Sequence, residues 1–149
     1  MWTCDRLGLD AIVSEQTQYS LVAREIEREV LSFARRQGIG ILAYSPVGGG
    51  LLTGKYRRGV APPKGSRGDK SPDWLDATTD AQWATIETTV AVAGEVGATP
   101  GQVALAWVLA QDGVSSAIIG PHTLGQLRDS LGALDVELSD ETLDRLDSA

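Results

Sequence analysis

The chain has 149 residues, of which 42% are hydrophobic, and this is enough for one ordinary globular domain with a core. Its formal net charge of −7 argues against a general nucleic-acid binder and against a protein of anionic membrane surfaces, because both need a basic footprint. The single cysteine, Cys4, excludes an internal disulfide and a multi-cysteine metal site, and it is compatible with a reducing compartment.

The first residues predict neither a signal peptide nor a membrane span. They carry Asp5, Arg6 and Asp10 without a long apolar run, and no later stretch approaches the ~20 apolar residues of a spanning helix. We therefore expect a cytoplasmic protein. Residues 2–9 would suit the tail of a helix, which predicts a chain that begins partway through a larger fold.

The next segments predict one strand–helix–strand unit. Residues 11–16 read as a short buried strand, and residues 24–37 have apolar side chains at helical spacing up to Gly38. Residues 39–43 form a short apolar run that is long enough for one buried strand. A helical connection of this kind makes the two strands parallel.

Polar and glycine residues follow the second strand at once. Tyr44 and Ser45 precede Pro46 and the glycine triplet 48–50, at the carboxyl end of the strand, where ligands bind in α/β folds. An ordinary glycine-rich turn is an equal alternative, because neither GxGxxG nor GxxxxGK[ST] is present. Residues 55–79 show no hydrophobic period and predict a long loop. Its basic residues are either solvated surface or an anion-binding cluster; they are Arg57, Arg58, Lys64, Arg67 and Lys70.

The second half of the chain predicts four helices and one further strand. Three of the helices begin with a capping box, and the last begins with a cap. Thr79 opens a helix to about residue 96, Thr99 opens a largely buried helix to about 111, and Thr123 opens one to about 134. Residues 116–119 form a third strand before Gly120, and Ser139 caps a last helix to 147. Three parallel strands cannot close a barrel, and they make a poor stand-alone sheet.

The candidate chemistry is binding rather than hydrolysis or metal catalysis. The only histidine is His122, no nucleophile elbow surrounds a serine, and one histidine with one distant cysteine makes a metal site improbable. Gln16 can hydrogen-bond an amide, Tyr44 can offer a flat face, and Ser45 with the glycine loop can meet a phosphate. The helix that starts near Thr123 can receive a second anion. This inventory suits a dinucleotide.

Four segments resemble the aldo-keto reductase family, and together they cover nearly the whole chain in the family's order. They are QTQYSL (16–21), GIGILAYSPVGGGLLTGKY (38–56), TPGQVALAWVLAQ (99–111) and AIIGPHTLGQLRDSLGALDVELSDE (117–141). Members of this family are (β/α)8 barrels that reduce small carbonyl compounds with NADPH. The resemblance implies a single fragment, residues 1–149: a partial TIM barrel with about strands six to eight, their helices and a C-terminal helix.

The resemblance also implies cofactor-binding positions. Gln16 resembles the glutamine that binds the nicotinamide carboxamide, and Tyr44 the tyrosine on which the ring stacks. The positions around the phosphates and the adenosine are Ser45, Val47, Gly49, Leu52, Thr53, Gly54, Lys55, Gly120, Pro121, His122, Thr123, Gln126, Asp129 and Ser130. Where many relatives carry arginine this chain has His122, and where they usually carry asparagine it has Ser130. NAD therefore stays open beside NADP, because histidine is a weaker phosphate partner than a bidentate arginine.

The family's catalytic aspartate, tyrosine, lysine and histidine lie in the first half of the barrel, and no position here matches them. We therefore assign no catalytic residue and no metal ligand, and we expect the chain alone to be inactive. Three hypotheses remain: the cofactor-binding half of a reductase, a non-catalytic half-barrel that self-associates or complements a separate N-terminal half, and a small complete nucleotide-binding domain. A half-barrel would expose apolar surface and two strand edges.

Overall fold

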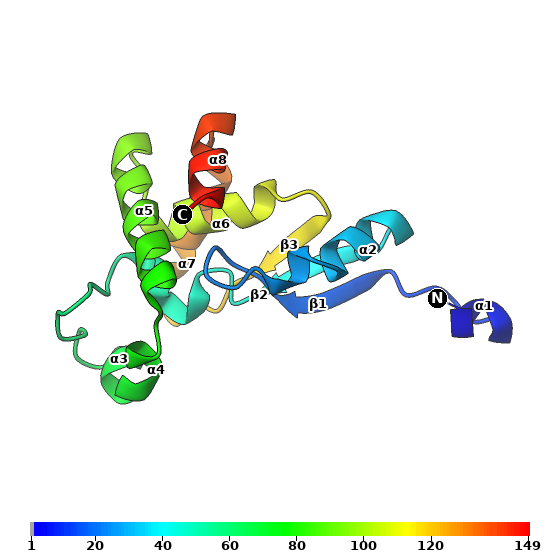
Figure 1. Cartoon of the computed structure of the whole chain (residues 1–149), viewed down its shortest axis with the longest axis horizontal. Coiled ribbons are helices and arrows are strands. Elements are labelled where there is room, and N and C mark those ends of the chain that lie inside the picture. The colour runs from blue at the N-terminus through cyan, green and yellow to red at the C-terminus, as the bar shows by residue number, and fades with distance from the viewer. Residues whose placement is uncertain (1) are drawn as a thin grey trace.

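The computed structural model describes residues 2–149 as one α/β arrangement (Figure 1). No helix in this range is long and apolar enough to cross a membrane. In chain order the elements are α1 (Trp2–Leu7), β1 (Ser14–Gln18), η1 (Glu25–Glu27), α2 (Val30–Gln37), β2 (Gly40–Tyr44), η2 (Gly48–Thr53), α3 (Arg67–Lys70), α4 (Pro72–Asp76), α5 (Asp80–Val96), α6 (Pro100–Ala110), β3 (Val114–Ile118), α7 (Leu124–Leu131), η3 (Gly132–Asp135) and α8 (Asp140–Asp147).

The three strands form one parallel sheet in the order β1-β2-β3, which confirms the predicted α/β class. Gln18 lies opposite Tyr44, and Tyr44 lies opposite Ile118, so the three carboxyl ends are level with one another. Within residues 2–149, β1 and β3 each have β2 as their one strand neighbour. The sheet thus has two edges, as expected for a part of a barrel.

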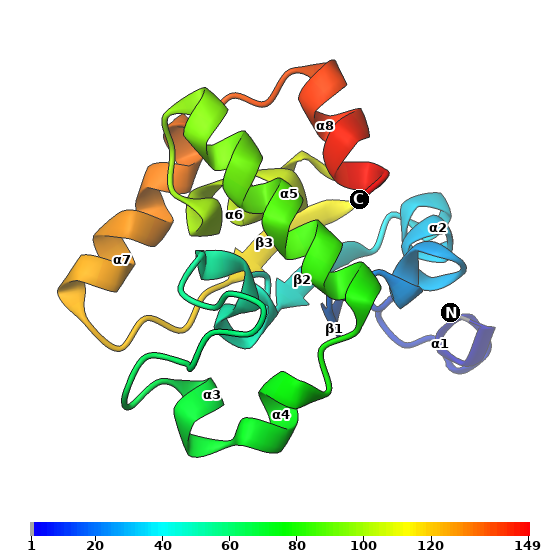
Figure 2. The same ribbon diagram turned by 60° about the vertical axis from the view of Figure 1, so that its left-hand side comes forward.

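The two faces of this sheet are covered unequally. Ile41 and Ala43 are fully buried, in a core that they share with residues of α2 and α6. The alternate residues of β2, Leu42 and Tyr44, belong to the opposite face, and Tyr44 keeps 40% of its surface exposed. Gln16, Gln18, Ser116 and Ile118 share that face and are all exposed. We call these six residues the open face. Figure 2 shows β1, β2 and β3 side by side in the sheet that carries it.

The prediction for the first strand was wrong in place and in burial. The strand is Ser14–Gln18 rather than 11–16, and four of its five residues are exposed. It lies at a sheet edge, where apolar Ile12 and Val13 just before it have no element packed over them. The other two strands were predicted within two residues of their bounds.

The helix starts were predicted best. Thr79 and Thr99 form reciprocal capping boxes with Gln82 and Gln102, which confirms both predictions. Helix α6 is buried almost all round, with Trp107 at its centre fully covered. Ser139 caps α8 as predicted.

Three predicted elements need correction. The helix 24–37 is interrupted: Glu25–Glu27 is a 3-10 turn, and α2 begins only at Val30. The third capping box is half formed, because the Gln126 side chain accepts the N–H of His122 instead of that of Thr123. Helix α7 ends at Leu131 and continues as the 3-10 turn η3.

The segment 55–79 is not an irregular loop throughout, because it contains the short helices α3 and α4. Tyr56 is buried, its hydroxyl accepts the backbone N–H of Gly68 at 3.0 Å, and its ring meets Trp74 edge-on. Local caps and these aromatic contacts therefore order a segment in which no hydrophobic period is visible.

Candidate functional site

The first part of the candidate site is the open face at the carboxyl ends of β1 and β2. Gln16 and Tyr44 both lie on it with exposed side chains. The backbone N–H of Tyr19 donates to the carbonyl oxygen of Tyr44 over 3.2 Å, so pairing of the two strands continues past the end of β1. The structure thus brings the predicted amide and the predicted flat face together on one surface.

The second part is the glycine loop, residues 45–54, which turns away from β2. Ser45 is the one described non-glycine residue with positive φ, at 54°, and its carbonyl accepts the N–H of Gly48 at 2.9 Å. Leu51 and Leu52 anchor the loop in the core with buried side chains, and the backbone N–H of Leu52 donates to the Val47 carbonyl at 3.3 Å. The hydroxyl of Thr53 donates to the Gly50 carbonyl at 2.8 Å.

Two cationic side chains lie against the glycines of this loop. A Cβ on Gly49 would stand 2.7 Å from Nη1 of Arg67, and one on Gly50 would stand 2.7 Å from Nζ of Lys55. The Arg67 guanidinium stacks 4.4 Å from the ring centroid of Trp74. No carboxylate of residues 2–149 forms an ion pair with either cation. The positive charge beside Gly49 and Gly50 is therefore not neutralised within the described chain.

Arg67 is the residue of this site that the sequence did not single out. In the sequence it was only one of the five basic residues that follow Lys55 in the segment 55–79, and spacing along the chain does not predict its contact with the loop. The sequence signal that could have pointed to Arg67 is the cluster of basic residues directly after a glycine loop in an acidic chain. Helix α3 brings Arg67 back over the loop.

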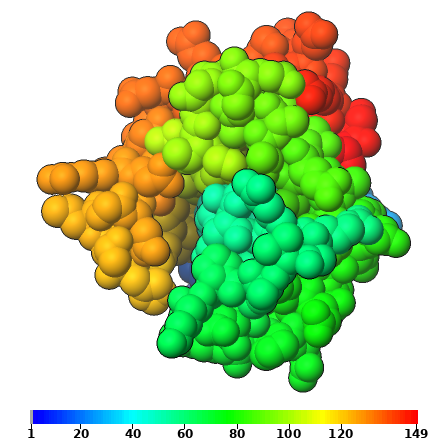
Figure 3. Space-filling view, turned by 90° about the vertical axis from the view of Figure 1, so that its left-hand side faces the viewer, coloured from blue at the N-terminus to red at the C-terminus, as the bar shows by residue number. Residues whose placement is uncertain are grey.

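The third part is the turn before α7, residues 120–123. His122 and Thr123 are exposed, Pro121 is half-buried, and a Cβ on Gly120 would meet nothing within 4 Å. Gln126 accepts the N–H of His122 at 2.7 Å, which leaves the amide nitrogen of its exposed side chain for a ligand. Figure 3 shows residues of this turn and α7, in yellow to orange, on the same side of the molecule as the segment after β2, in cyan to green.

The first turn of α6 contacts both the end of the glycine loop and helix α7. A Cβ on Gly54 would lie 2.9 Å from Pro100, so the glycine loop ends directly on this turn. From the other side, the Asp129 carboxylate accepts the hydroxyl of Thr99 at 3.0 Å, and the side chain of Gln102 donates to the Asp129 carbonyl. Asp129 therefore has a structural partner, whereas the hydroxyl of half-buried Ser130 next to it has no hydrogen-bond partner among residues 2–149.

Titratable groups with shifted pKa values lie behind the site. Burial, and then the hydrogen bond to Glu27, raise the pKa of the Tyr19 phenol well above its ordinary value of 10.0. Burial alone would lower the pKa of Arg24, but its hydrogen bond to Glu27 and the nearby carboxylates outweigh this, and the pKa is raised. In the described part of the chain, no three His, Cys, Asp or Glu residues are grouped so that they could hold a metal ion.

Comparison with known proteins gives the relationship of the chain. A family model described as "Aldo/keto reductase family" matches residues 3–149. The uncharacterized oxidoreductase YrpG of Bacillus subtilis (strain 168) is 40% identical over 132 residues, which cover 89% of this chain and 38% of that protein. Protein tas of Escherichia coli (strain K12) is 33% identical over 144 residues, which cover 97% of this chain and 41% of that protein.

A probable voltage-gated potassium channel subunit beta of Arabidopsis thaliana is 33% identical over 135 residues, covering 89% of this chain and 41% of that protein. The chain thus spans about two fifths of the length of these relatives. The match of the family model over residues 3–149, with the parallel α/β fold, shows that this chain belongs to the aldo/keto reductase family.

Proposed function

We propose that this chain is the cofactor-binding part of an NADP(H)-dependent aldo/keto reductase that acts on a small carbonyl compound. In this proposal β1, β2 and β3 correspond to about strands six to eight of the barrel, and the open face is the inner face. The observation that carries it is the glycine loop at the end of β2, with the unpaired cations Lys55 and Arg67 against it.

The residues fit the nicotinamide half of such a cofactor. Tyr44 offers an exposed ring on the open face, where a nicotinamide can stack. Gln16, on the neighbouring strand, carries both a donor and an acceptor, which is what recognition of a carboxamide requires. A bound nicotinamide supplies the hydride for reduction of a carbonyl. The role of this chain is to hold that ring in place and leave one of its faces open.

The residues also fit the pyrophosphate. Because Gly49 and Gly50 carry no Cβ, the cationic ends of Arg67 and Lys55 can lie directly against the loop backbone, where they can meet phosphate oxygens. Lys55 and Arg67 supply two charges at that place. Ser45, Val47 and residues 52–54 complete the loop around the phosphates.

We assign the turn 120–123 and Gln126, with Asp129 and Ser130 beside them, to the adenosine end. His122 is exposed at this turn and can approach a 2′-phosphate. We propose NADP as the cofactor. NAD stays open as the less favoured choice, because an exposed histidine binds a 2′-phosphate more weakly than a bidentate arginine. Since no residue here matches the family's proton donor, we propose that the chain alone does not reduce carbonyls.

The test of this function is cofactor affinity in charge-matched variants. Lys55→Gln and Arg67→Gln should each weaken NADPH binding about tenfold or more, because each removes a charge-assisted contact to phosphate. Arg57→Gln, which loses the same charge two residues beyond Lys55, should leave the affinity within about twofold. Equal losses in all three variants would reject a specific phosphate site and leave only a general effect of charge.

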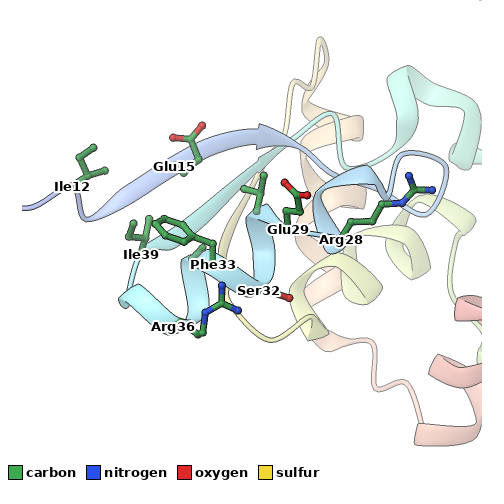
Figure 4. A pocket seen from close by; sticks show the side chains of 10 residues that line it. Ile12, Glu15, Arg28, Glu29, Ser32, Phe33, Arg36 and Ile39 are labelled. Atoms are coloured by element: carbon green, nitrogen blue, oxygen red, sulfur yellow. The ribbon is translucent and has the colours of Figure 1, made fainter. Parts of the chain in front are cut away.

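A second candidate function, a non-catalytic half that pairs with another polypeptide, is favoured by a separate observation. A groove of about 670 Å³ lies between edge strand β1 and helix α2. Figure 4 shows Ile12 and Glu15 on its β1 side and Phe33, Ser32 and Arg36 on its α2 side. Phe33 keeps 45% of its surface exposed there. An apolar groove beside the outer edge of a parallel strand suits a further strand and helix of the same kind.

Two measurements distinguish whether the groove binds a second copy of the chain or a separate N-terminal half. If copies of the chain pair, sedimentation should show concentration-dependent dimers, and Phe33→Asp should abolish them. Val60→Asp, which is exposed outside the groove, should leave them intact. If a separate N-terminal half is the partner, co-expression should give a stoichiometric complex that Phe33→Asp disrupts. A monomer that captures neither partner would reject this second function.

A further inference from the structure

A closed ring of contacts joins the end of β1 to α8, near the other end of the chain. Its members are Tyr19, Arg24, Glu27, Trp107 and Asp147, and we call it the α8 clasp. The Tyr19 hydroxyl donates to Oε1 of Glu27 at 2.7 Å. Arg24 forms a two-pronged pair with the same carboxylate, at 2.8 and 3.1 Å. These contacts hold the 3-10 turn against the residue that follows β1.

The ring closes through α6 and α8. The Arg24 guanidinium donates to the carbonyl of Asp147 at 2.9 Å and lies 3.2 Å from its carboxylate. That carboxylate also accepts the indole N–H of Trp107 at 3.0 Å. Arg24 stacks 5.1 Å from the Trp107 ring centroid, and the Trp107 ring lies 5.3 Å from that of Tyr19. Each of the three charged members of the clasp, Arg24, Glu27 and Asp147, thus has two partners within it.

The position of Tyr19 gives this clasp its importance. Its ring and that of Trp107 are fully buried, so Tyr19 cannot shift without disturbing the core. Its backbone N–H is bonded to the Tyr44 carbonyl, one residue past the level pair of Gln18 and Tyr44. The clasp therefore ends on the backbone that sets the spacing of β1 and β2 at the open face.

We propose that the α8 clasp is a positioning device: α8 holds the carboxyl end of β1 against β2 and thereby fixes Gln16 beside Tyr44. Its consequence for cofactor binding rests on the function proposed above. Loss of the Asp147 carboxylate should loosen the carboxyl end of this strand pair and leave the amino end in place.

Backbone hydrogen exchange tests the proposal on the free chain. Two amides report on the two ends of the same strand pair: Tyr19, bonded to Tyr44, and Gly40, bonded to the Val13 carbonyl at 2.9 Å. In Asp147→Ala, exchange at Tyr19 should accelerate about tenfold, while exchange at Gly40 stays within about twofold. Asp144→Ala, on the exposed side of the same helix, should change neither amide. Asp147→Asn retains an acceptor for the Trp107 indole and should give an intermediate rate at Tyr19.

Equal acceleration at Tyr19 and Gly40 would overturn the proposal, because it would show a general loss of stability. An unchanged rate at Tyr19 would also overturn it. A binding measurement on the same variants then reads the consequence: NADPH should bind several-fold more weakly to Asp147→Ala, and 2′,5′-ADP, which lacks the nicotinamide, should bind equally well. A wild-type chain that binds neither compound would reject the proposed function. The exchange rates would still show whether the clasp positions the carboxyl end of β1.

Discussion

The carboxylate of Asp129 accepts the hydroxyl of Thr99 over 3.0 Å and so joins α7 to the first turn of α6. The same hydroxyl accepts the N–H of Gln102 as the cap of α6. On its other side this turn meets the end of the glycine loop, at Gly54. One helix start therefore supports both the loop that we assign to the pyrophosphate and the helix that we assign to the adenosine end.

Thr99→Ala should lower the free energy of unfolding by about 1 kcal/mol, because it removes the cap of α6 and the link to Asp129 together. Thr88→Ala, inside α5, removes a threonine hydroxyl of no capping role and should change stability by less than about 0.5 kcal/mol. Urea unfolding of both variants measures the difference. A Thr99 variant as stable as wild type would show that the first turn of α6 is held by packing alone.

Gly50→Ala should destabilise the chain by about 1 kcal/mol or more, since φ is 104° at this position and a Cβ would meet Lys55. Gly94→Ala is the matched control, because Gly94 lies inside α5 with nothing within 4 Å of an added Cβ. There the substitution should stabilise by up to about 1 kcal/mol. Thermal unfolding of the two variants should therefore shift in opposite directions, and a shift in the same direction would contradict the strain at Gly50.

The raised pKa of Tyr19 predicts a loss of stability in alkaline solution. Above the ordinary pKa of 10.0 the unfolded chain releases the phenol proton, whereas the folded chain keeps it. The unfolded state then binds fewer protons, so the free energy of unfolding falls as pH rises, by about 1.4 kcal/mol per pH unit for this group. Below pH 10 the contribution is fully present.

Tyr19→Phe removes this dependence. Urea unfolding between about pH 9 and 11.5 should show a smaller decline for Tyr19→Phe than for wild type, and the difference should begin near pH 10. Identical declines would mean that the Tyr19 phenol ionises as readily in the folded chain as in the unfolded one.

His122→Arg should raise the preference for NADPH over NADH about tenfold, because a guanidinium can bind a 2′-phosphate at two points. The dissociation constants of both cofactors, measured on the same preparation, give the ratio. The affinity for NADH should stay unchanged, because NADH lacks the 2′-phosphate. An equal gain for both cofactors would place His122 away from that phosphate.

The sequence predicted features that depend on short spacing. The capping boxes at Thr79 and Thr99, the burial of α6 and the parallel strands all follow from patterns within a few residues, and the structure confirms them. The resemblance added the family, which the comparisons confirm. Features that depend on contacts across the chain were missed.

Two examples show the physical reason. Helix 24–37 looked continuous, but Arg24 and Glu27 bind partners in α8 and after β1, and they form a 3-10 turn instead. Arg67 looked like a solvated charge, yet the folding of the segment after Tyr56 brings it to Gly49. Both features depend on contacts with residues that are distant in the sequence, so the pattern of neighbouring residues does not predict them.

Whether this chain holds a nicotinamide dinucleotide can be measured by titration with NADPH, followed through the fluorescence of its four tryptophans. Size-exclusion chromatography of the same sample establishes that the species is compact. We predict saturable quenching with one NADPH per chain, abolished in the Lys55→Gln, Arg67→Gln double variant and retained in Arg57→Gln. A compact, folded chain whose fluorescence does not respond to NADPH, or responds without saturation, would contradict the account.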